Sequence, residues 1–245
     1  MSGHSKWNNI KRKKEKTDGQ KAKIFTKIGR EMAVAIKEGG SSDPNSNSKL
    51  RDLIAKAKAN NVPNDNIERI IKKASSDDKA NYETVVYEGY GPCGVAVIVE
   101  TLTDNRNRTA GDIRHYFDKY GGNLGTTGCV SFMFTEKGVI IADGEDVDED
   151  KAMEDFMEAG ADDFNFDDED TIEIITAPAD VTAVATAIEE KGYKVISADA
   201  AQVPSTYTSI DDPDTAVKMN RLLEMLEDND DVQNVWHNWE NPTEE

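Results

Sequence analysis

Residues 82–103, YETVVYEGYGPCGVAVIVETLT, mark the point where the chain changes from a helical to a strand-forming pattern. Valine, isoleucine, threonine and tyrosine dominate both halves of this stretch, and this composition is typical of strands. The segment Gly91-Pro92-Cys93-Gly94 between the halves predicts a turn, so the stretch is expected to form a hairpin. Because the region before Tyr82 repeats its apolar residues with a helical period, the two parts are expected to form different structures.

The region before the hairpin is predicted to contain three short amphipathic helices. The first begins near Gln20 and ends at Gly39-Gly40, since glycine commonly follows a helix C-terminus. The second ends before Val62-Pro63, because a proline excludes the preceding residue from the α region. The third opens at Asp65, which forms a capping-box pattern with the glutamate three residues later. These helices predict a small bundle that follows a polar, basic arm, residues 1–20.

The region after the hairpin alternates helices and strands. RTAGDIRHYFDKY (108–120) is predicted to be a helix and CVSFMF (129–134) a strand. Residues 138–203 follow the order β-α-β-β-α-β, which is the ferredoxin-like order. After Pro204 a short strand, a helix from Asp214 to about Asp228 and a last strand are expected. The helix is expected to bury Val217, Leu222, Met225 and Leu226. Since residues 82–135 contain too few elements to close a core, residues 205–245 are expected to return to them.

The fold class predicted from these patterns is α+β with three domains. An N-terminal three-helix domain with the arm occupies 1–80, a discontinuous α+β domain occupies 81–136 and 205–245, and an acidic ferredoxin-like domain, 137–204, is inserted into the second.

Charge is divided unevenly along the chain. Residues 1–80 contain 19 Lys and Arg against 10 Asp and Glu, a net charge of +9. Since the whole chain has a formal net charge of −19, the other 165 residues carry −28. An asymmetry of this size indicates that the basic segment meets a polyanion. The predicted partner is a nucleic acid, either DNA or ribosomal RNA, with no membrane and no small-molecule cofactor.

Two basic segments supply the candidate contacts. In the arm, lysines and an arginine surround Trp7, which could stack on an exposed base while the cations contact phosphates. In TDNRNRT (103–109), arginine and asparagine alternate where a strand leads into a helix, and such forked donors suit phosphates or RNA edges. The predicted nucleic-acid-binding residues are Lys6, Trp7, Lys11, Arg12, Lys13, Lys14, Lys16, Lys21, Lys23, Lys27, Arg30, Arg106, Asn107, Arg108 and Arg114.

Each segment also has a structural interpretation that the sequence leaves open. The arm could be a solvated charged tail. In the loop, Asp104 and Asn105 could cap the helix while the arginines pair with nearby acids.

Other motifs point away from cofactors and catalysis. GGNLGTTG (121–128) lacks the Gly-Lys-Ser/Thr ending of a phosphate-binding loop, so a helix C-cap followed by a strand is expected there. The acidic run 143–170 fails the EF-hand pattern, and the three histidines show no metal-ligand spacing. No catalytic, cofactor or metal residues are predicted. Two cysteines are too few for a disulfide framework, and no apolar signal-peptide core or membrane span is visible, so a cytoplasmic protein is expected.

Several blocks resemble the YebC/PmpR family. They are MSGHSKWNNIK, KIFTKIGRE, NVPNDNIERIIKKA, YEGYGPCGVAVIVETLTDNRNRT, GGNLGTTGCVSFMF and LEDNDDVQNVWHN, and they span the chain from end to end. The family comprises probable transcriptional regulators and includes the mitochondrial translational activator of cytochrome c oxidase subunit I. The resemblance implies three domains and a non-enzymatic, nucleic-acid-associated role. Cys93 departs from the family pattern, in which a small residue such as glycine is common.

Three functions remain open at this point. The first is a DNA-binding transcriptional regulator, which the resemblance favours. The second is a ribosome-associated translation factor that binds ribosomal RNA, for example easing the synthesis of proline-rich stretches. It is suggested by the absence of a clear helix-turn-helix signature with a base-reading helix. The third is an enzyme acting on nucleic acid, such as a hydrolase that uses Asp104 and His115.

Overall fold

The structure, a computed structural model, describes residues 18–75, 81–166, 171–240 and 242, with the side chains of 18–22 and 59 excepted. Its N-terminal part consists of helices α2 (Asp18–Gly39), α3 (Ser48–Ala59) and α4 (Asn64–Ser75). Met32, Leu50 and Ile67 are buried between them, as the helical spacing predicts. Asn47 joins the first two helices, because its side-chain oxygen caps α3 while its amide nitrogen donates to Ala35 O at 2.8 Å.

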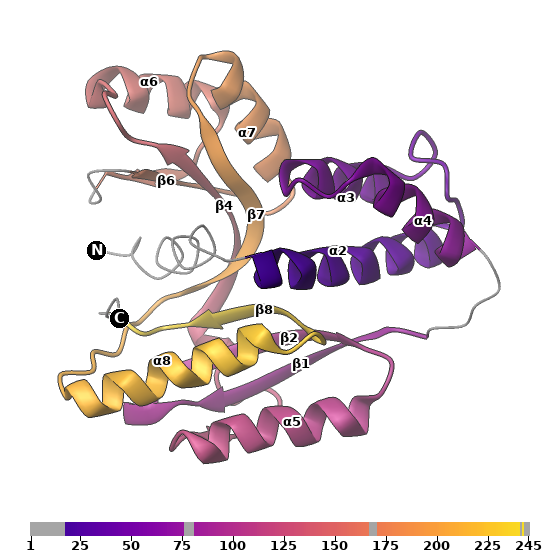
Figure 1. The fold of residues 1–245 in the computed structure, drawn as a ribbon. Helices are drawn as coiled ribbons and strands as arrows, with labels where there is room; N and C mark the ends of the chain where they lie inside the picture. The colour runs from indigo at the N-terminus through magenta and orange to yellow at the C-terminus, as the bar shows by residue number, and fades with distance from the viewer. Residues whose placement is uncertain (1–17, 76–80, 167–170, 241, 243–245) are drawn as a thin grey trace.

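The first sheet is antiparallel, in the order β3-β1-β2-β8. Its strands are β1 (Glu83–Tyr90), β2 (Ala96–Thr103), β3 (Asn123–Leu124) and β8 (Val232–His237). Helices α5 (Arg106–Lys119) and α8 (Pro213–Asp228) bury Phe117 and Met219 against the sheet in one core with Val97 and Trp239. Figure 1 shows α5 below this sheet, α8 in front of its strands and α2 above it. The C-terminal segment therefore returns to the hairpin, as expected from the sequence.

The second sheet is also antiparallel, in the order β5-β6-β4-β7. Its elements follow one another as β4 (Phe134–Asp143), α6 (Glu149–Ala159), β5 (Asp163–Asn165), β6 (Thr171–Thr176), α7 (Val181–Glu190) and β7 (Val195–Pro204). Both helices pack on one face, where Phe156 and Ile188 are buried with Ile140 and Ile174. This strand order confirms the predicted ferredoxin-like unit, and the α+β fold class is confirmed with it.

Two details of the sequence prediction are wrong. CVSFMF is not a separate strand, because residues 131–133 form a 3₁₀ turn, η2 (Ser131–Met133), and only Phe134 belongs to β4. Val217, expected to face inward on α8, is 45% exposed, and the buried face instead includes Ala216 and the polar Asn220. The strand at 129–134 and the inward position of Val217 were predicted from apolar composition alone. Contacts with segments that are distant in sequence but close in space determine both.

The three-domain division is supported by separate cores. The helical bundle, the first sheet with α5 and α8, and the second sheet with α6 and α7 each bury their own apolar cluster. We therefore propose 1–80, 81–136 with 205–245, and 137–204 as the domain boundaries. Within the described ranges, no helix combines the length and apolar character that crossing a membrane requires.

Candidate nucleic-acid interface

The basic arm lies outside the described residues. This applies to seven predicted contacts, Lys6, Trp7, Lys11, Arg12, Lys13, Lys14 and Lys16, which stay predictions from sequence. Lys21 lies in α2, but its side chain is also outside the description. The structure therefore places the other seven predicted residues, on α2 and α5.

Three basic residues of α2 face the second domain. Lys23 forms an ion pair of 2.9 Å with Asp228, and Lys27 Nζ donates to Glu227 O at 2.7 Å. Arg30, further along the same face, donates to Asp230 O at 2.6 Å. Residues spaced by three or four positions share a helix face, so this side of α2 forms a continuous contact with the end of α8 and the segment that joins it to β8.

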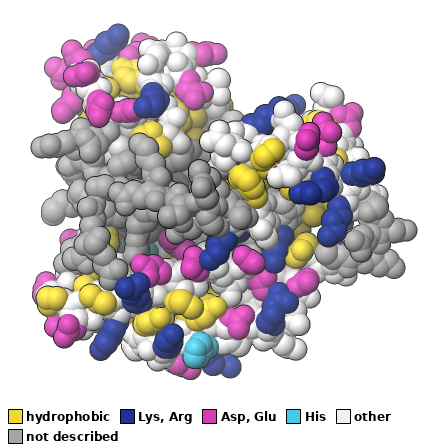
Figure 2. Space-filling view, in the orientation of Figure 1, with side chains coloured by type: hydrophobic (Ala, Val, Ile, Leu, Met, Phe, Trp, Pro, Cys, Tyr) yellow, Lys and Arg dark blue, Asp and Glu magenta, His cyan; other side chains and the backbone are white. Residues whose placement is uncertain are grey.

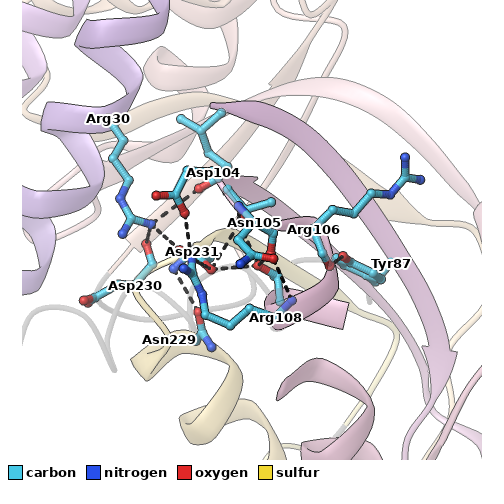
Figure 3. A network of polar contacts seen from close by, with 12 residues as sticks. Arg30, Tyr87, Asp104, Asn105, Arg106, Arg108, Asn229, Asp230 and Asp231 are labelled. Carbon is cyan, nitrogen blue, oxygen red and sulfur yellow. Dashed lines mark hydrogen bonds and ion pairs between the residues drawn. The ribbon is translucent and has the colours of Figure 1, made fainter. Parts of the chain in front are cut away.

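Asp231 is the centre of this contact. Its side chain is buried and accepts hydrogen bonds from Arg30 at 2.6 Å, Arg108 at 2.7 Å and Thr109 Oγ1 at 2.7 Å. Thr103 Oγ1 adds a longer bond of 3.3 Å. Burial raises the pKa of Asp231, but these donors outweigh burial, so the pKa lies below the ordinary carboxyl value. Asp231 is therefore an anion bonded to two arginines from different domains (Figure 3).

Asn105 and Arg108, at the start of α5, have structural roles within the protein: one caps the helix and the other forms ion pairs. Asn105 caps α5, since its side-chain oxygen accepts from Arg108 N at 3.1 Å. Arg108 pairs with Asp104 at 2.9 Å as well as with Asp231, and these hydrogen bonds raise its pKa. The sequence prediction of a nucleic-acid contact at Arg108 and Arg30 is untested, but both side chains already have anionic partners within the protein.

Arg106, Asn107 and Arg114 are exposed on α5 and lie outside that network. Arg106 and Arg114 are two helical turns apart on the same face of the helix. Figure 3 shows the Arg106 side chain extending away from Asp231, beyond Tyr87, whose hydroxyl donates to Arg106 O at 3.4 Å. No ion pair involves Arg106 or Arg114 among the described residues, so their charges are open to a partner.

The glycine-rich segment 121–128 ends in a cluster of backbone N–H groups that already holds an anion. The buried carboxylate of Glu88 accepts from Gly128 N at 2.8 Å, Val130 N at 2.9 Å and Ser131 N at 2.8 Å. Burial raises the pKa of Glu88, and the three donors lower it below its ordinary value. A phosphate could not use these amides without displacing Glu88, in agreement with the absence of a phosphate-loop motif.

Glu88→Gln is expected to lower the free energy of unfolding by about 2 kcal/mol, because the Gln amide group places a donor against a backbone donor. Urea denaturation at neutral pH measures this loss, with Glu83→Gln at an exposed position of the same strand as control. Because the folded pKa of Glu88 is depressed, its contribution is present above the ordinary carboxyl pKa and is lost as the pH falls through the folded pKa. Equal losses in both variants would contradict the role given to Glu88.

No metal or catalytic site was predicted. In the part of the chain that the structure describes, no three His, Cys, Asp or Glu residues are arranged to hold a metal ion.

Asp231 and Glu88 are the organising residues that the sequence did not single out. Asp231 stands among identical side chains at 228 and 230, and its partners are more than 120 positions away. The available signal was its place directly before the last predicted strand, whose first residue, Val232, is buried, since an unpaired carboxylate beside a buried residue would be costly.

The chain matches two family models that together span most of its length. Residues 5–77 match the TACO1/YebC protein N-terminal domain, and residues 82–239 match the TACO1/YebC second and third domain. Among curated relatives, a "Probable transcriptional regulatory protein" from Acetivibrio thermocellus is 61% identical over 98% of this chain and 99% of its own. A protein of the same description from Ruminiclostridium cellulolyticum is 58% identical over 100% and 98%. The crystal structure of a conserved hypothetical protein, Aq1575 from Aquifex aeolicus, is similar with a TM-score of 0.83, 42% identity and 94% coverage of both chains.

Proposed function

The chain belongs to the TACO1/YebC family, a non-enzymatic family of probable transcriptional regulators, and from this premise we propose that it regulates transcription by binding DNA in the cytoplasm. The basic arm is the main contact in this proposal, and the exposed face of α5 with Arg106, Asn107 and Arg114 is a second one. Arg30 and Arg108 contribute by holding the helical domain against the second domain, since Asp231 bonds both of them.

The observation that carries the proposal is the charge division, +9 in residues 1–80 against −28 in the remainder. Figure 2 shows Lys and Arg side chains over the helical domain and mainly Asp and Glu over the inserted domain. A polyanion is attracted to one end of such a molecule and repelled from the other, within about 8 Å of each charge at physiological salt. The acidic inserted domain therefore orients the protein on the nucleic acid.

A second candidate is a ribosome-associated factor that binds ribosomal RNA. The observation in its favour is that the exposed cations of α4, Arg69, Lys72 and Lys73, are suited to phosphates more than to base edges. A protein that contacts phosphates through an arm and a basic surface accommodates folded RNA as readily as a promoter.

Fractionation of a cell lysate on a sucrose gradient at moderate salt, combined with footprinting of promoter DNA, tests the proposal. Transcriptional regulation predicts that the protein stays at the top of the gradient and protects specific promoter segments. Migration with ribosomes and no promoter protection would support the ribosomal candidate instead. Absence from both nucleic acids would contradict a nucleic-acid-binding role.

A further inference from the structure

A groove of about 770 Å³ lies between α2 and α4 and reaches Asn81 and Tyr82 at the entry to the second domain. Its half-buried lining includes Phe25, Ile70 and Tyr82, while its exposed lining includes Lys37, Arg69 and Lys73. The groove therefore combines an apolar floor that contains aromatic rings with a cationic rim. None of its rim residues belongs to the basic arm or to α5.

The described lining of the groove carries charge of one sign only. Every ionisable group of lysine, arginine, aspartate or glutamate type among its described lining residues is cationic, although acids outnumber bases 48 to 29 in the whole chain. Two of the rim cations bond neutral groups: Arg69 donates to Asn66 Oδ1 at 2.7 Å, and Lys37 donates to Asn81 Oδ1. An amide acceptor orients a cation without neutralising it, so the groove keeps its attraction for an anion.

The packing of the two helices fixes the shape of the groove. A Cβ atom at Gly29 would lie 3.2 Å from Ile70 Cδ1, so the glycine permits the close approach of α2 and α4. The Arg30 guanidinium lies 5.4 Å from the centroid of the Tyr82 ring, and the same guanidinium is bonded to Asp231. The wall formed by Tyr82 is thus held by the network that joins the domains.

We propose that this groove binds one unpaired nucleotide of the nucleic acid, an inference that rests on the proposed function. The base lies on the apolar floor beside Tyr82 and Phe25, and its flanking phosphates are bound by Lys37, Arg69 and Lys73. A base reaches such a floor only when it is out of a stack, as in a loop, a bulge or a single strand. A fully paired duplex offers the groove phosphates alone, so the site selects unpaired segments.

The experiment uses the full chain and two probes, a DNA hairpin with 2-aminopurine in its unpaired loop and a blunt DNA duplex of the stem sequence. For the hairpin, R69Q/K73Q is expected to make the slope of log affinity against log salt concentration shallower by about 1.4. This is the change expected for the loss of two phosphate contacts to a single strand. The matched control R51Q/K58Q removes two exposed charges from α3, outside the groove, and is expected to change this slope less.

Tyr82→Leu tests the stacking part of the inference. It is expected to weaken hairpin binding about tenfold, to leave duplex binding unchanged and to abolish the change in 2-aminopurine fluorescence on binding. Equal effects of R69Q/K73Q and its control, or an unaltered fluorescence change in Tyr82→Leu, would overturn the groove as the site while nucleic-acid binding itself stands. Failure of the unaltered chain to bind either probe would overturn both proposals.

Discussion

Replacing Lys11, Arg12, Lys13 and Lys14 by alanine is expected to change the binding of duplex DNA. The slope of log affinity against log salt concentration is expected to become shallower by up to about 3.6. Each phosphate contact releases a condensed counterion, and each contributes about 0.9 to that slope. The loss of affinity is expected to be the same for every DNA sequence, since phosphate contacts carry no sequence information. Fluorescence anisotropy titrations at several salt concentrations measure both quantities.

The matched control for this variant is K49A/K151A/K194A/K218A, which removes four exposed lysines outside the arm. It changes the net charge by the same amount, so a difference between the two variants reports position and not total charge. The slope measured for the control is expected to differ from that of the unaltered chain by no more than about 0.9, the contribution of one phosphate contact. A slope unchanged in the arm variant would remove the arm from the binding site.

Asp231→Ala is expected to lower the free energy of unfolding by about 3 kcal/mol. The substitution leaves the Arg30 guanidinium, 17% exposed, without the buried carboxylate that compensates its charge, and it also removes one of the acceptors of Thr109. Arg108 is 45% exposed and regains water more easily, which keeps the loss at the low end of the range for broken buried pairs. Urea denaturation at neutral pH measures the change.

Asp230→Ala is the control. Asp230 is exposed and adjacent to Asp231, so this substitution removes the same charge without removing a buried carboxylate. A double-mutant cycle with Arg30→Ala isolates the ion pair, and a coupling energy of about 1 kcal/mol or more is expected for groups in direct contact. A coupling near zero would contradict the role of Asp231 as the link between α2 and the second domain.

The effect of Asp231 also depends on pH in a defined direction. Its folded pKa is below the ordinary value, so the carboxylate contributes stability above the ordinary pKa of about 4. That contribution is lost as the pH falls through the folded pKa. The difference in unfolding free energy between the unaltered chain and Asp231→Ala is therefore expected to be constant from pH 7 to about pH 5 and to narrow at lower pH.

Local patterns were sufficient to predict most of the fold. The three helices, the hairpin and the ferredoxin-like unit follow from apolar spacing and from glycine and proline at their ends, all of which act over a few residues. The prediction of a strand at 129–133 was wrong because Glu88, about 40 positions earlier, accepts hydrogen bonds from backbone amides of this segment. These amides are therefore not available to pair with a neighbouring strand. That interaction leaves no trace in the composition of the segment itself.

The candidate site was predictable only in part for the same reason. The sequence identified the cations of the loop before α5, but not that Arg108 pairs with a carboxylate 123 positions later. Lys37 belongs to α2, whereas Arg69 and Lys73 belong to α4. Their place along one groove follows from the packing of α2 on α4, where Gly29 meets Ile70. Residue type predicted the chemistry, and tertiary packing decides which groups share a surface.

Strands β4 and β7 give the ferredoxin-like unit its entrance and its exit side by side. Phe134 pairs with Pro204, and Ser205 N donates to Met133 O at 2.8 Å just outside the pair. Because the two connections of this inserted unit lie next to each other, its size and charge can change between homologous chains while the domain that contains the insertion keeps its fold. The charge of this inserted unit can therefore change between homologous chains without altering the surface that we propose to bind nucleic acid.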